Sequence, residues 1–405
     1  MIRTKAYVIG TFDTKGDELL FVCGLLQEAS INCCTVDVST RLHQCEADIS
    51  ANEVASYHPE RPDLLSNNDG RGDAVSAMSE ALELFLISQT DVGGVLGLGG
   101  SGGTSLITRS MRKLPIGLPK LMVSTVASGN VRPYVGESDI FMLYSVTDIA
   151  GINQISSTIL GQAAHAMVGM MSHKIPDFES DRTVIGLTMF GVTTTCVERV
   201  RSLLSDKYEC LIFHATGTGG RSMEKLIDSG FITGVIDLTT TEICDLLMGG
   251  VLSAGEERMD SIIRTKVPYI VSVGALDMVN FGPLDTVPQK YHGRNLYQHN
   301  PQVTLVRTTP QENKLMAEWI AIKLNAMEGP VRLILPENGV SALSVEGQPF
   351  HDPEADRILF ETLADQVITT HDRQIIRLPY AINDPDFAEE VADTFMSLHS
   401  NIGHE

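Results

Sequence analysis

A glycine-rich segment, Gly97-Leu98-Gly99-Gly100-Ser101-Gly102-Gly103-Thr104, follows an apolar strand-like run and precedes a helical pattern. Glycines at such a junction let backbone N–H groups approach phosphate oxygens without obstruction from Cβ atoms, so the segment predicts a phosphate-binding loop. The alternative is a tight turn whose glycines only let the helix and strand pack together. A nicotinamide dinucleotide site would place an acid at the end of the next strand, but that strand ends at Val123-Ser124-Thr125. We therefore expect a phosphate ligand other than NAD.

A second polar segment, Gly10-Thr11-Phe12-Asp13-Thr14-Lys15-Gly16, follows the first strand-like run of the chain. It brings a carboxylate, an ammonium group and two hydroxyl groups into one loop. Asp13 could bind Mg²⁺ directly or through water, and Lys15 could place a positive charge on phosphate, as a metal-bound polyphosphate requires. The simpler interpretation is that Asp13 or Thr14 caps the next helix and that Lys15 is solvated. The P-loop pattern G-x-x-x-x-G-K-[ST] does not occur in the sequence.

The second half contains a further polar segment, His214-Ala215-Thr216-Gly217-Thr218-Gly219-Gly220-Arg221-Ser222, followed by Asp237 and by Thr240-Thr241-Glu242. Its loop amides, the Arg221 guanidinium and the threonine hydroxyls predict a phosphate or carboxylate site, with His214 or Glu242 as catalytic proton carrier. Asp237 also gives a partial dinucleotide fingerprint, which Ser222 weakens because it replaces the third glycine. The alternative makes His214 a buried strand residue and Glu242 part of a capping box.

Short β-branched runs that end in such loops and lead into helical patterns are typical of parallel sheets covered by helices. Runs of this kind occupy residues 6–10, 94–98 and 121–124. We expect an α/β fold with two Rossmann-like domains, each a mostly parallel sheet with helices on both faces. A polar, Pro-containing connector at 175–182 predicts an N-terminal domain over residues 1–178 and a C-terminal domain over 182–405. Ligands of such sheets bind beyond the carboxyl ends of the strands, where these polar segments lie.

The two halves contain similar segments in the same order, which predicts an internal duplication. Residues 10–15 correspond to 190–195, residues 97–101 to 215–222, and residues 123–127 to 270–275. Each segment follows a strand-like run. The pairs therefore favour two related units.

Composition limits the partners and the compartment. Thirty Lys and Arg against 51 Asp and Glu give a formal net charge of −21, which disfavours general nucleic-acid binding. Seven cysteines, with Cys33 and Cys34 adjacent, form no disulfide framework and indicate a reducing cytoplasm, where we expect this pair to be buried as small apolar residues. The uncharged segment 150–171 is too polar to span a membrane and predicts a buried helix that could pack against another subunit.

The motifs together resemble the Tm-one-like ATP-binding family. Besides the three polar segments, the resemblance rests on Ser124-Thr125-Val126-Ala127-Ser128-Gly129, Thr188-Met189-Phe190-Gly191-Val192-Thr193, Asp277-Met278-Val279-Asn280-Phe281-Gly282 and His299-Asn300-Pro301, and it covers nearly the whole chain. It implies two Rossmann-like domains, ATP in the first, and a homo-oligomer of at least two chains. ATP would contact Gly10, Thr11, Asp13, Thr14, Lys15, Gly99, Gly100, Ser101, Gly102, Gly103, Thr104, Thr125 and Gly129.

Three functional hypotheses stay open at this point. The first is a cytoplasmic ATP-binding protein, with an enzymatic site for a small anionic metabolite in the cleft between the domains. The second is a regulatory or protein-interaction module in which ATP only stabilises the shape. The third is an ATP-independent lyase or hydrolase that acts on a carboxylated metabolite through His214 and Glu242. Turnover of ATP or of a metabolite would distinguish an enzyme from a module.

Overall fold

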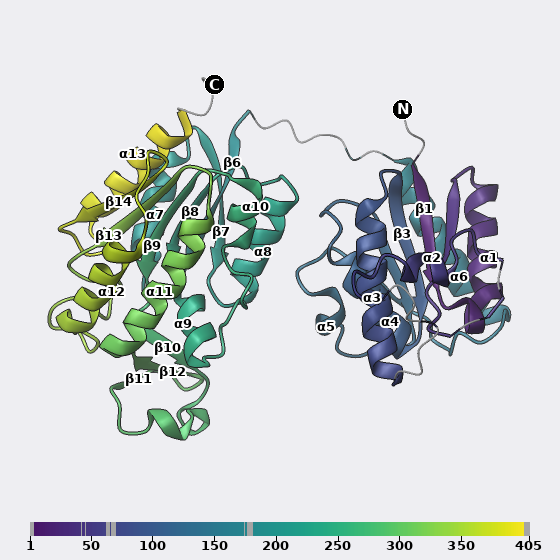
Figure 1. Ribbon diagram of the computed structural model, residues 1–405, viewed down its shortest axis with the longest axis horizontal. Helices are drawn as coiled ribbons and strands as arrows, with labels where there is room; N and C mark the ends of the chain where they lie inside the picture. The colour runs from purple at the N-terminus through teal and green to yellow at the C-terminus, as the bar shows by residue number, and fades with distance from the viewer. Residues whose placement is uncertain are drawn as a thin grey trace. The chain divides into compact units, whose positions relative to one another are not determined.

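Strands and helices alternate along the chain in the computed structural model, as the β-branched runs and helical patterns predict (Figure 1). The structure describes residues 4–41, 43–44, 46–61, 65, 70–173, 175 and 181–400. The chain divides into two units, Met1–Phe178 and Glu179–Glu405. Most of the connector expected at 175–182 lies outside the described residues.

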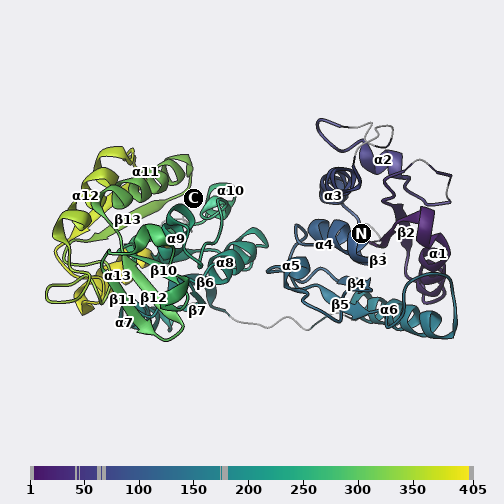
Figure 2. The same cartoon turned by 90° about the horizontal axis from the view of Figure 1, so that it is seen from below.

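The first unit is built on one parallel sheet. Its described elements are β1 (Lys5–Gly10), α1 (Phe12–Glu28), β2 (Cys33–Asp37), α2 (Ala51–Ala55), α3 (Arg71–Ser88), β3 (Val92–Gly99), α4 (Ser101–Met111), β4 (Lys120–Ser124), α5 (Arg132–Val135), β5 (Phe141–Tyr144) and α6 (Gln154–Ser172). The strand order is β2-β1-β3-β4-β5. Helices α1 and α6 pack on one face, while α2, α3 and α4 pack on the other (Figure 2). This is the flavodoxin-like doubly wound order.

The second unit repeats this plan with a larger sheet. Its described elements are β6 (Thr183–Met189), α7 (Thr194–Leu204), β7 (Tyr208–His214), α8 (Thr218–Asp228), β8 (Val235–Thr239), α9 (Thr241–Met248), α10 (Asp260–Thr265), β9 (Tyr269–Gly274), β10 (Met278–Phe281), η2 (Leu284–Thr286), η3 (Gln289–Tyr291), β11 (Leu296–Asn300), β12 (Val303–Arg307), α11 (Pro310–Ala326), β13 (Val331–Pro336), α12 (Pro353–Gln366), β14 (Arg373–Leu378) and α13 (Pro385–Ser400). Six parallel strands have the order β14-β13-β9-β8-β6-β7, and β10-β12-β11 form a separate antiparallel sheet. The two parallel sheets with flanking helices confirm the predicted fold class.

The strand orders support an internal duplication but correct one of its predicted pairs. Strands β7-β6-β8-β9 have the same order as β2-β1-β3-β4, so the loops after β1 and β6 correspond, as do those after β4 and β9. The pairing of 97–101 with 215–222 is wrong, because the first segment follows β3 whereas the second follows β7, the counterpart of β2. Both are glycine-rich turns between a strand and a helix, and local turn chemistry does not reveal the position of a strand in its sheet.

Helix α6 forms over the uncharged segment, but it is buried on one side only. Its buried residues are Ser156, Leu160, Ala163, Ala164 and Met167. This face packs against α1 and the sheet, whereas Ile155 on α6 is 48% exposed. The prediction of a helix with a buried face is confirmed, and packing of α6 against another subunit stays a prediction. Among the described residues, no helix is both long and apolar enough to cross a membrane.

Cys33 differs from the expectation because it is bonded to another cysteine. Helix α1 is followed by a short turn into the adjacent strand β2, which brings the Cα atoms of Cys23 and Cys33 to 6.1 Å, and the two form a disulfide. The neighbouring Cys34 is buried and free, as predicted. Burial raises the pKa of the Cys34 thiol to about 11, so it is protonated at neutral pH.

Candidate functional site

The two polar segments of the first unit follow adjacent strands at the point where the strand order reverses. Strand β1 pairs with both β2 and β3, so the chain leaves β1 toward one side of the sheet and later returns on the other. In doubly wound sheets of this order, ligands bind at the carboxyl ends of these two strands. The structure thus brings the first turn of α1, which contains Asp13 and Lys15, close to the glycine loop.

The glycines of the second loop divide into two groups according to the space around them. A Cβ atom on Gly97 would lie 2.6 Å from the sulfur of Met122, and one on Gly99 would lie 2.8 Å from the backbone of Gly103. These two glycines are required by packing, as the alternative interpretation of the loop predicted. In contrast, a Cβ atom on Gly102 would meet nothing within 4 Å.

Gly100 and Gly103 resemble Gly102 in this respect. A Cβ atom on either would come no closer than 3.8 Å to its nearest neighbour, and none of the three has a positive φ angle. Neither packing nor backbone conformation therefore explains why glycine occupies these three positions. Close approach of another molecule to the backbone is one physical reason for glycine at such positions.

The first turn of α4 presents N–H groups that the described chain does not use. No described residue accepts a hydrogen bond from the N–H groups of Ser101, Gly102 or Gly103, whereas Thr104 donates to the carbonyl of Gly100. Helix α4 has no side-chain cap at Gly100. Unpaired amides at the start of a helix, together with the helix dipole, favour a bound anion.

The start of α1 differs because a carboxylate of the chain already occupies it. Asp37, at the end of β2, accepts hydrogen bonds from the Phe12 amide at 3.0 Å and from the Ser39 hydroxyl at 2.5 Å. The Ser39 hydroxyl also lies 3.3 Å from the amide of Asp13 and 3.2 Å from its Oδ1. The N-cap residue is Thr11, without a side-chain cap bond, so neither Asp13 nor Thr14 caps this helix.

Sequence reasoning did not identify Asp37 as part of this edge. The available signal was a lone acid at the end of a β-branched run, Cys34-Thr35-Val36-Asp37. In the structure Asp37 is 1% exposed and positions the loop after β1.

Lys15 and Glu18 connect α1 to the loop between β5 and α6. The Lys15 ammonium donates to the carbonyl of Ile149 at 2.6 Å, and the amide of Gly151 donates to the Glu18 carboxylate at 2.6 Å. The alternative interpretation expected Lys15 to be solvated, but its ammonium is bonded to a backbone carbonyl of the chain. Its ammonium has a neutral partner and forms no ion pair with a carboxylate of the described residues.

The other residues predicted to contact ATP lie partly in the interior and partly at the surface. The hydroxyls of Thr104 and Ser124 lie 2.6 Å apart in the buried interior, where they join α4 to β4. Thr125 is partly exposed beside the glycine loop, and its amide donates to the carbonyl of Gly99. Gly129 is exposed in the turn after β4, while Gly10 packs against Leu19.

In the second unit, Glu242 occupies the position where the sequence predicted an anion. Its Oε1 accepts hydrogen bonds from the amides of Gly217 at 2.6 Å and Gly220 at 3.0 Å. Its Oε2 accepts from Arg258 at 2.9 Å, and the side chain is 1% exposed. Glu242 therefore forms no capping box, and the amides of the loop are already bound to a carboxylate of the chain.

Arg258 is the centre of a buried charge cluster that sequence reasoning missed. Its guanidinium contacts Asp237 at 2.8 Å and Glu224 at 3.3 Å in addition to Glu242, and its side chain is 1% exposed. Tyr269 also donates to Asp237 at 2.6 Å. Burial raises the pKa values of Glu224 and Glu242, and Arg258 opposes this increase. Three carboxylates around one guanidinium make this cluster a fixed part of the core.

The remaining predicted residues of this region differ in burial and in their partners. His214 is exposed at the end of β7, and its ring centre lies 5.4 Å from that of Phe190. Arg221 donates to the carbonyl of Ser253 at 3.2 Å. Three further residues are partly exposed, namely Thr216, Thr218 and Gly219. Thr240 is buried, and its hydroxyl donates a hydrogen bond to the carbonyl of Ser272.

Side chains of the chain itself cover part of the edge of the second sheet that corresponds to the first unit's site. Val192, in the loop after β6, belongs to an apolar cluster with Ala275, Met278, Leu305 and Phe350, all at most 7% exposed. Two of these side chains come from the antiparallel sheet that has no counterpart in the first unit. Residues 239–241, at the end of β8 and directly after it, are fully buried.

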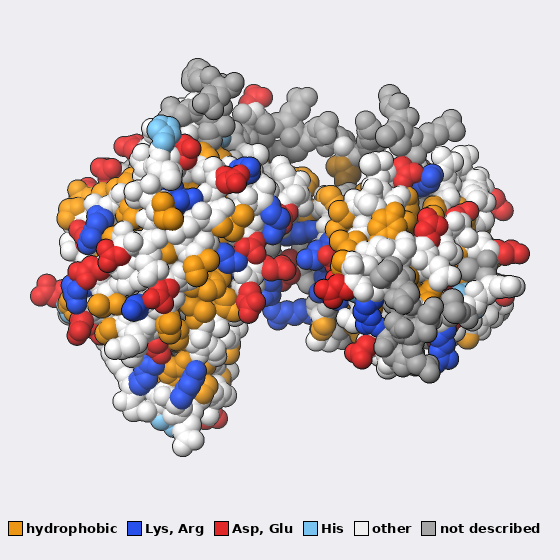
Figure 3. Space-filling model, viewed as in Figure 1, with side chains coloured by type: hydrophobic (Ala, Val, Ile, Leu, Met, Phe, Trp, Pro, Cys, Tyr) orange, Lys and Arg blue, Asp and Glu red, His pale blue; other side chains and the backbone are white. Residues whose placement is uncertain are grey.

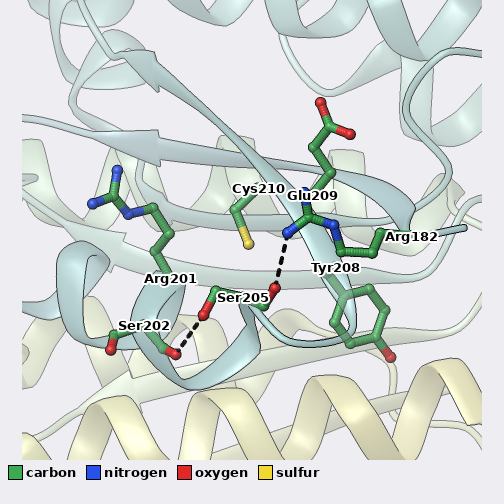
Figure 4. Close-up of a pocket in the computed structure, with 7 residues that line it drawn as sticks. All are labelled: Arg182, Arg201, Ser202, Ser205, Tyr208, Glu209 and Cys210. Carbon is green, nitrogen blue, oxygen red and sulfur yellow. Dashed lines mark hydrogen bonds between the residues drawn. The ribbon is translucent and has the colours of Figure 1, made fainter. Parts of the chain in front are cut away.

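A hollow of about 450 Å³ lies at the opposite, amino edge of this sheet (Figure 4). Arg182 and Arg201 extend from its two sides, and Arg182 donates to the carbonyl of Ser205 just beyond the end of α7. The carboxyl end of a helix carries a partial negative charge, so these arginines stabilise α7 there.

Charges of both signs are interspersed on the face shown in Figure 3, so the net negative charge is not concentrated in one region of that face. Within the described part of the chain, no group of three or more His, Cys, Asp or Glu side chains could hold a metal ion.

The fold and its strand-end loops define a tandem α/β protein with two doubly wound units. Models of the uncharacterised protein family UPF0261 match both: the N-terminal domain over residues 4–176 and the C-terminal domain over 182–399. The chain belongs to this family.

Relatives match the chain over nearly its whole length. A UPF0261 protein of Rhizobium meliloti is 52% identical over 394 residues, which cover 97% of this chain and 99% of that protein. A UPF0261 protein of Clostridium tetani is 44% identical, with 98% and 99% covered. The ToMV resistance protein Tm-1(GCR237) of Solanum lycopersicum is 43% identical over 425 residues, which cover 99% of this chain and 56% of that protein. The resemblance to Tm-one-like proteins is confirmed.

Proposed function

We propose that the first unit binds ATP at the carboxyl ends of β1 and β3. The observation that carries the proposal is the set of glycines at positions 100, 102 and 103, which neither packing nor φ requires. They adjoin the unused amides at the start of α4, which would bind the phosphates. Lys15 supplies a positive charge that forms no ion pair with a carboxylate in the described part of the chain.

Magnesium fits this site only as part of the nucleotide complex. Mg²⁺ keeps several waters and is commonly bound through one or two carboxylates together with substrate phosphates. Asp13 is exposed, and its Oδ1 accepts only from the Ser39 hydroxyl. Its carboxylate would hold the metal directly or through water, and the metal would neutralise phosphate charge.

The substitution Gly102→Ala tests the proposal because its effects on stability and on binding have opposite signs. Alanine in a helix is more favourable than glycine by about 0.5–1 kcal/mol, so the variant should unfold at a higher temperature without nucleotide. The methyl group would lie where the phosphate approaches, so the affinity for Mg-ATP in calorimetry should fall at least about tenfold.

Lysine variants provide a second measurement with a matched control. Lys15→Met removes a charge-assisted hydrogen bond to phosphate and should weaken Mg-ATP by about tenfold to a hundredfold. Lys5 lies at the opposite end of β1, paired with Asp91 at 2.8 Å, so Lys5→Met should leave the affinity unchanged. Unchanged ATP affinity in both Gly102→Ala and Lys15→Met, or no binding by the folded wild type, would contradict the proposal.

A further inference from the structure

A separate cavity of about 750 Å³ lies at the carboxyl ends of β13 and β14 in the second unit. One wall is a face of α12 formed by Pro353, Asp356, Arg357 and Phe360, and the other walls are the loops that follow the two strands. The volume lies within the range of small-molecule sites. The carboxyl edge is also where doubly wound sheets bind their ligands.

The cavity is lined by charged side chains of both signs. Arg357 and Arg377 supply guanidinium groups, and Glu337, Glu346 and Asp384 supply carboxylates. Arg377 contacts Glu337 at 2.6 Å, and Arg357 contacts a glutamate four residues further along α12. Because a guanidinium has five N–H donors and these two side chains are 53% and 44% exposed, both keep donors for a ligand.

His351 adds an imidazole ring to the lining. Its Nδ1 lies 3.1 Å from the backbone carbonyl of Ser344, and a carbonyl can only accept. In the neutral ring the proton is therefore on Nδ1, and Nε2 is left to accept a hydrogen bond. Asp356 also lines the cavity, with its Oδ1 bound to Arg307 at 2.6 Å.

We propose that this cavity binds a small zwitterion, an α-amino acid or a dipeptide. A purely anionic ligand would lie against Glu346 and Asp384, and a purely cationic ligand would lie against Arg357 and Arg377. A molecule with both charges satisfies both sets. Its carboxylate accepts from the guanidinium groups, which suit a planar carboxylate, and its ammonium donates to the carboxylates.

The apolar residues of the lining would contact the side chain of the ligand. Phe360 is 3% exposed at the base of the α12 wall, and Val345, Pro353 and Ala381 also contribute to the cavity. This proposal concerns the second unit alone. Its outcome is therefore independent of ATP binding by the first.

The test is a thermal-shift screen of the full chain against the twenty α-amino acids and a set of glycine-containing dipeptides, followed by calorimetry. A ligand that binds only the folded state raises the unfolding temperature of the unit that holds it. We expect at least one compound to bind. Two analogues of this compound serve as comparisons, one without the carboxylate and one without the ammonium group. Each should bind at least about tenfold more weakly than the compound itself.

Variants locate the binding. Arg357→Met and Arg377→Met should each weaken the ligand at least about tenfold. Arg199→Met is the matched control, because Arg199 is 49% exposed, lies on the same unit and pairs with Glu389 outside the cavity. The proposal is overturned if no amino acid or dipeptide binds, or if both cavity variants bind as tightly as the control. It is equally overturned if the acid without an ammonium binds as tightly as the zwitterion.

Discussion

Replacing Arg258 by methionine removes the only guanidinium at the centre of the buried cluster around Glu242. Methionine keeps an unbranched chain but leaves Glu224, Asp237 and Glu242 without their shared cation. Breaking a buried ion pair from one side costs about 3–5 kcal/mol, because a charge stays buried without compensation. A domain is typically stable by about 5–15 kcal/mol, so the variant should lose a large part of this stability.

The chain offers a simple assay, because its single tryptophan, Trp319, lies on α11 in the second unit. Urea unfolding followed by Trp319 fluorescence therefore reports on this unit alone. The control is Arg264→Met, whose partner Asp228 and whose own side chain are 33% and 52% exposed, so it should cost at most about 1 kcal/mol.

The pH dependence of Arg258→Met distinguishes a charge effect from a packing effect. Burial already raises the pKa values of Glu224 and Glu242, and the loss of Arg258 raises them further. The folded variant then binds protons that the unfolded chain releases, so its stability falls as the pH rises. The loss of stability should be greater at pH 8 than at pH 5. A cost below about 1 kcal/mol at pH 8, or an equal cost at both pH values, would refute the reasoning.

Two further predictions concern single carboxylates. Burial raises the pKa of Asp277 from 3.8 to about 6, and its Oδ1 has no hydrogen-bond partner within the described chain. Stability should therefore fall by up to about 3 kcal/mol as the pH rises from 4 to 6, and Asp277→Asn should remove this part of the dependence in Trp319-detected unfolding. Asp13→Asn should reduce the magnesium dependence of ATP affinity in calorimetry while leaving metal-free binding unchanged, and an unaltered magnesium dependence would exclude Asp13 as the metal ligand.

The fold class and the edge of the first sheet could be predicted from the sequence because the evidence for them is local. A β-branched run, a glycine-rich turn and a helical pattern are each visible within a dozen residues. Carboxyl ends of parallel strands share an edge, so the segments around Asp13 and Gly102 could be assigned to one side of the sheet.

The charge cluster could not be predicted, because its members depend on long-range packing. Arg258 lies in Glu256-Glu257-Arg258-Met259, which is typical of a solvated charged turn. Its partners are 34, 21 and 16 residues away along the chain. For the same reason, the sequence around Gly217 and Gly220 resembles an anion-binding loop. The residues next to them in the sequence do not indicate that Glu242 binds their amides.

The apolar cluster around Val192 and Phe350 has a consequence for stoichiometry. If the two units arose by duplication, two equivalent nucleotide sites per chain would be the simplest outcome. The second of these positions is instead occupied by side chains from the antiparallel sheet and the loop before α12. A titration of the proposed ATP site should therefore saturate at one nucleotide per chain, and in any assembly of identical chains the number of bound nucleotides would equal the number of subunits.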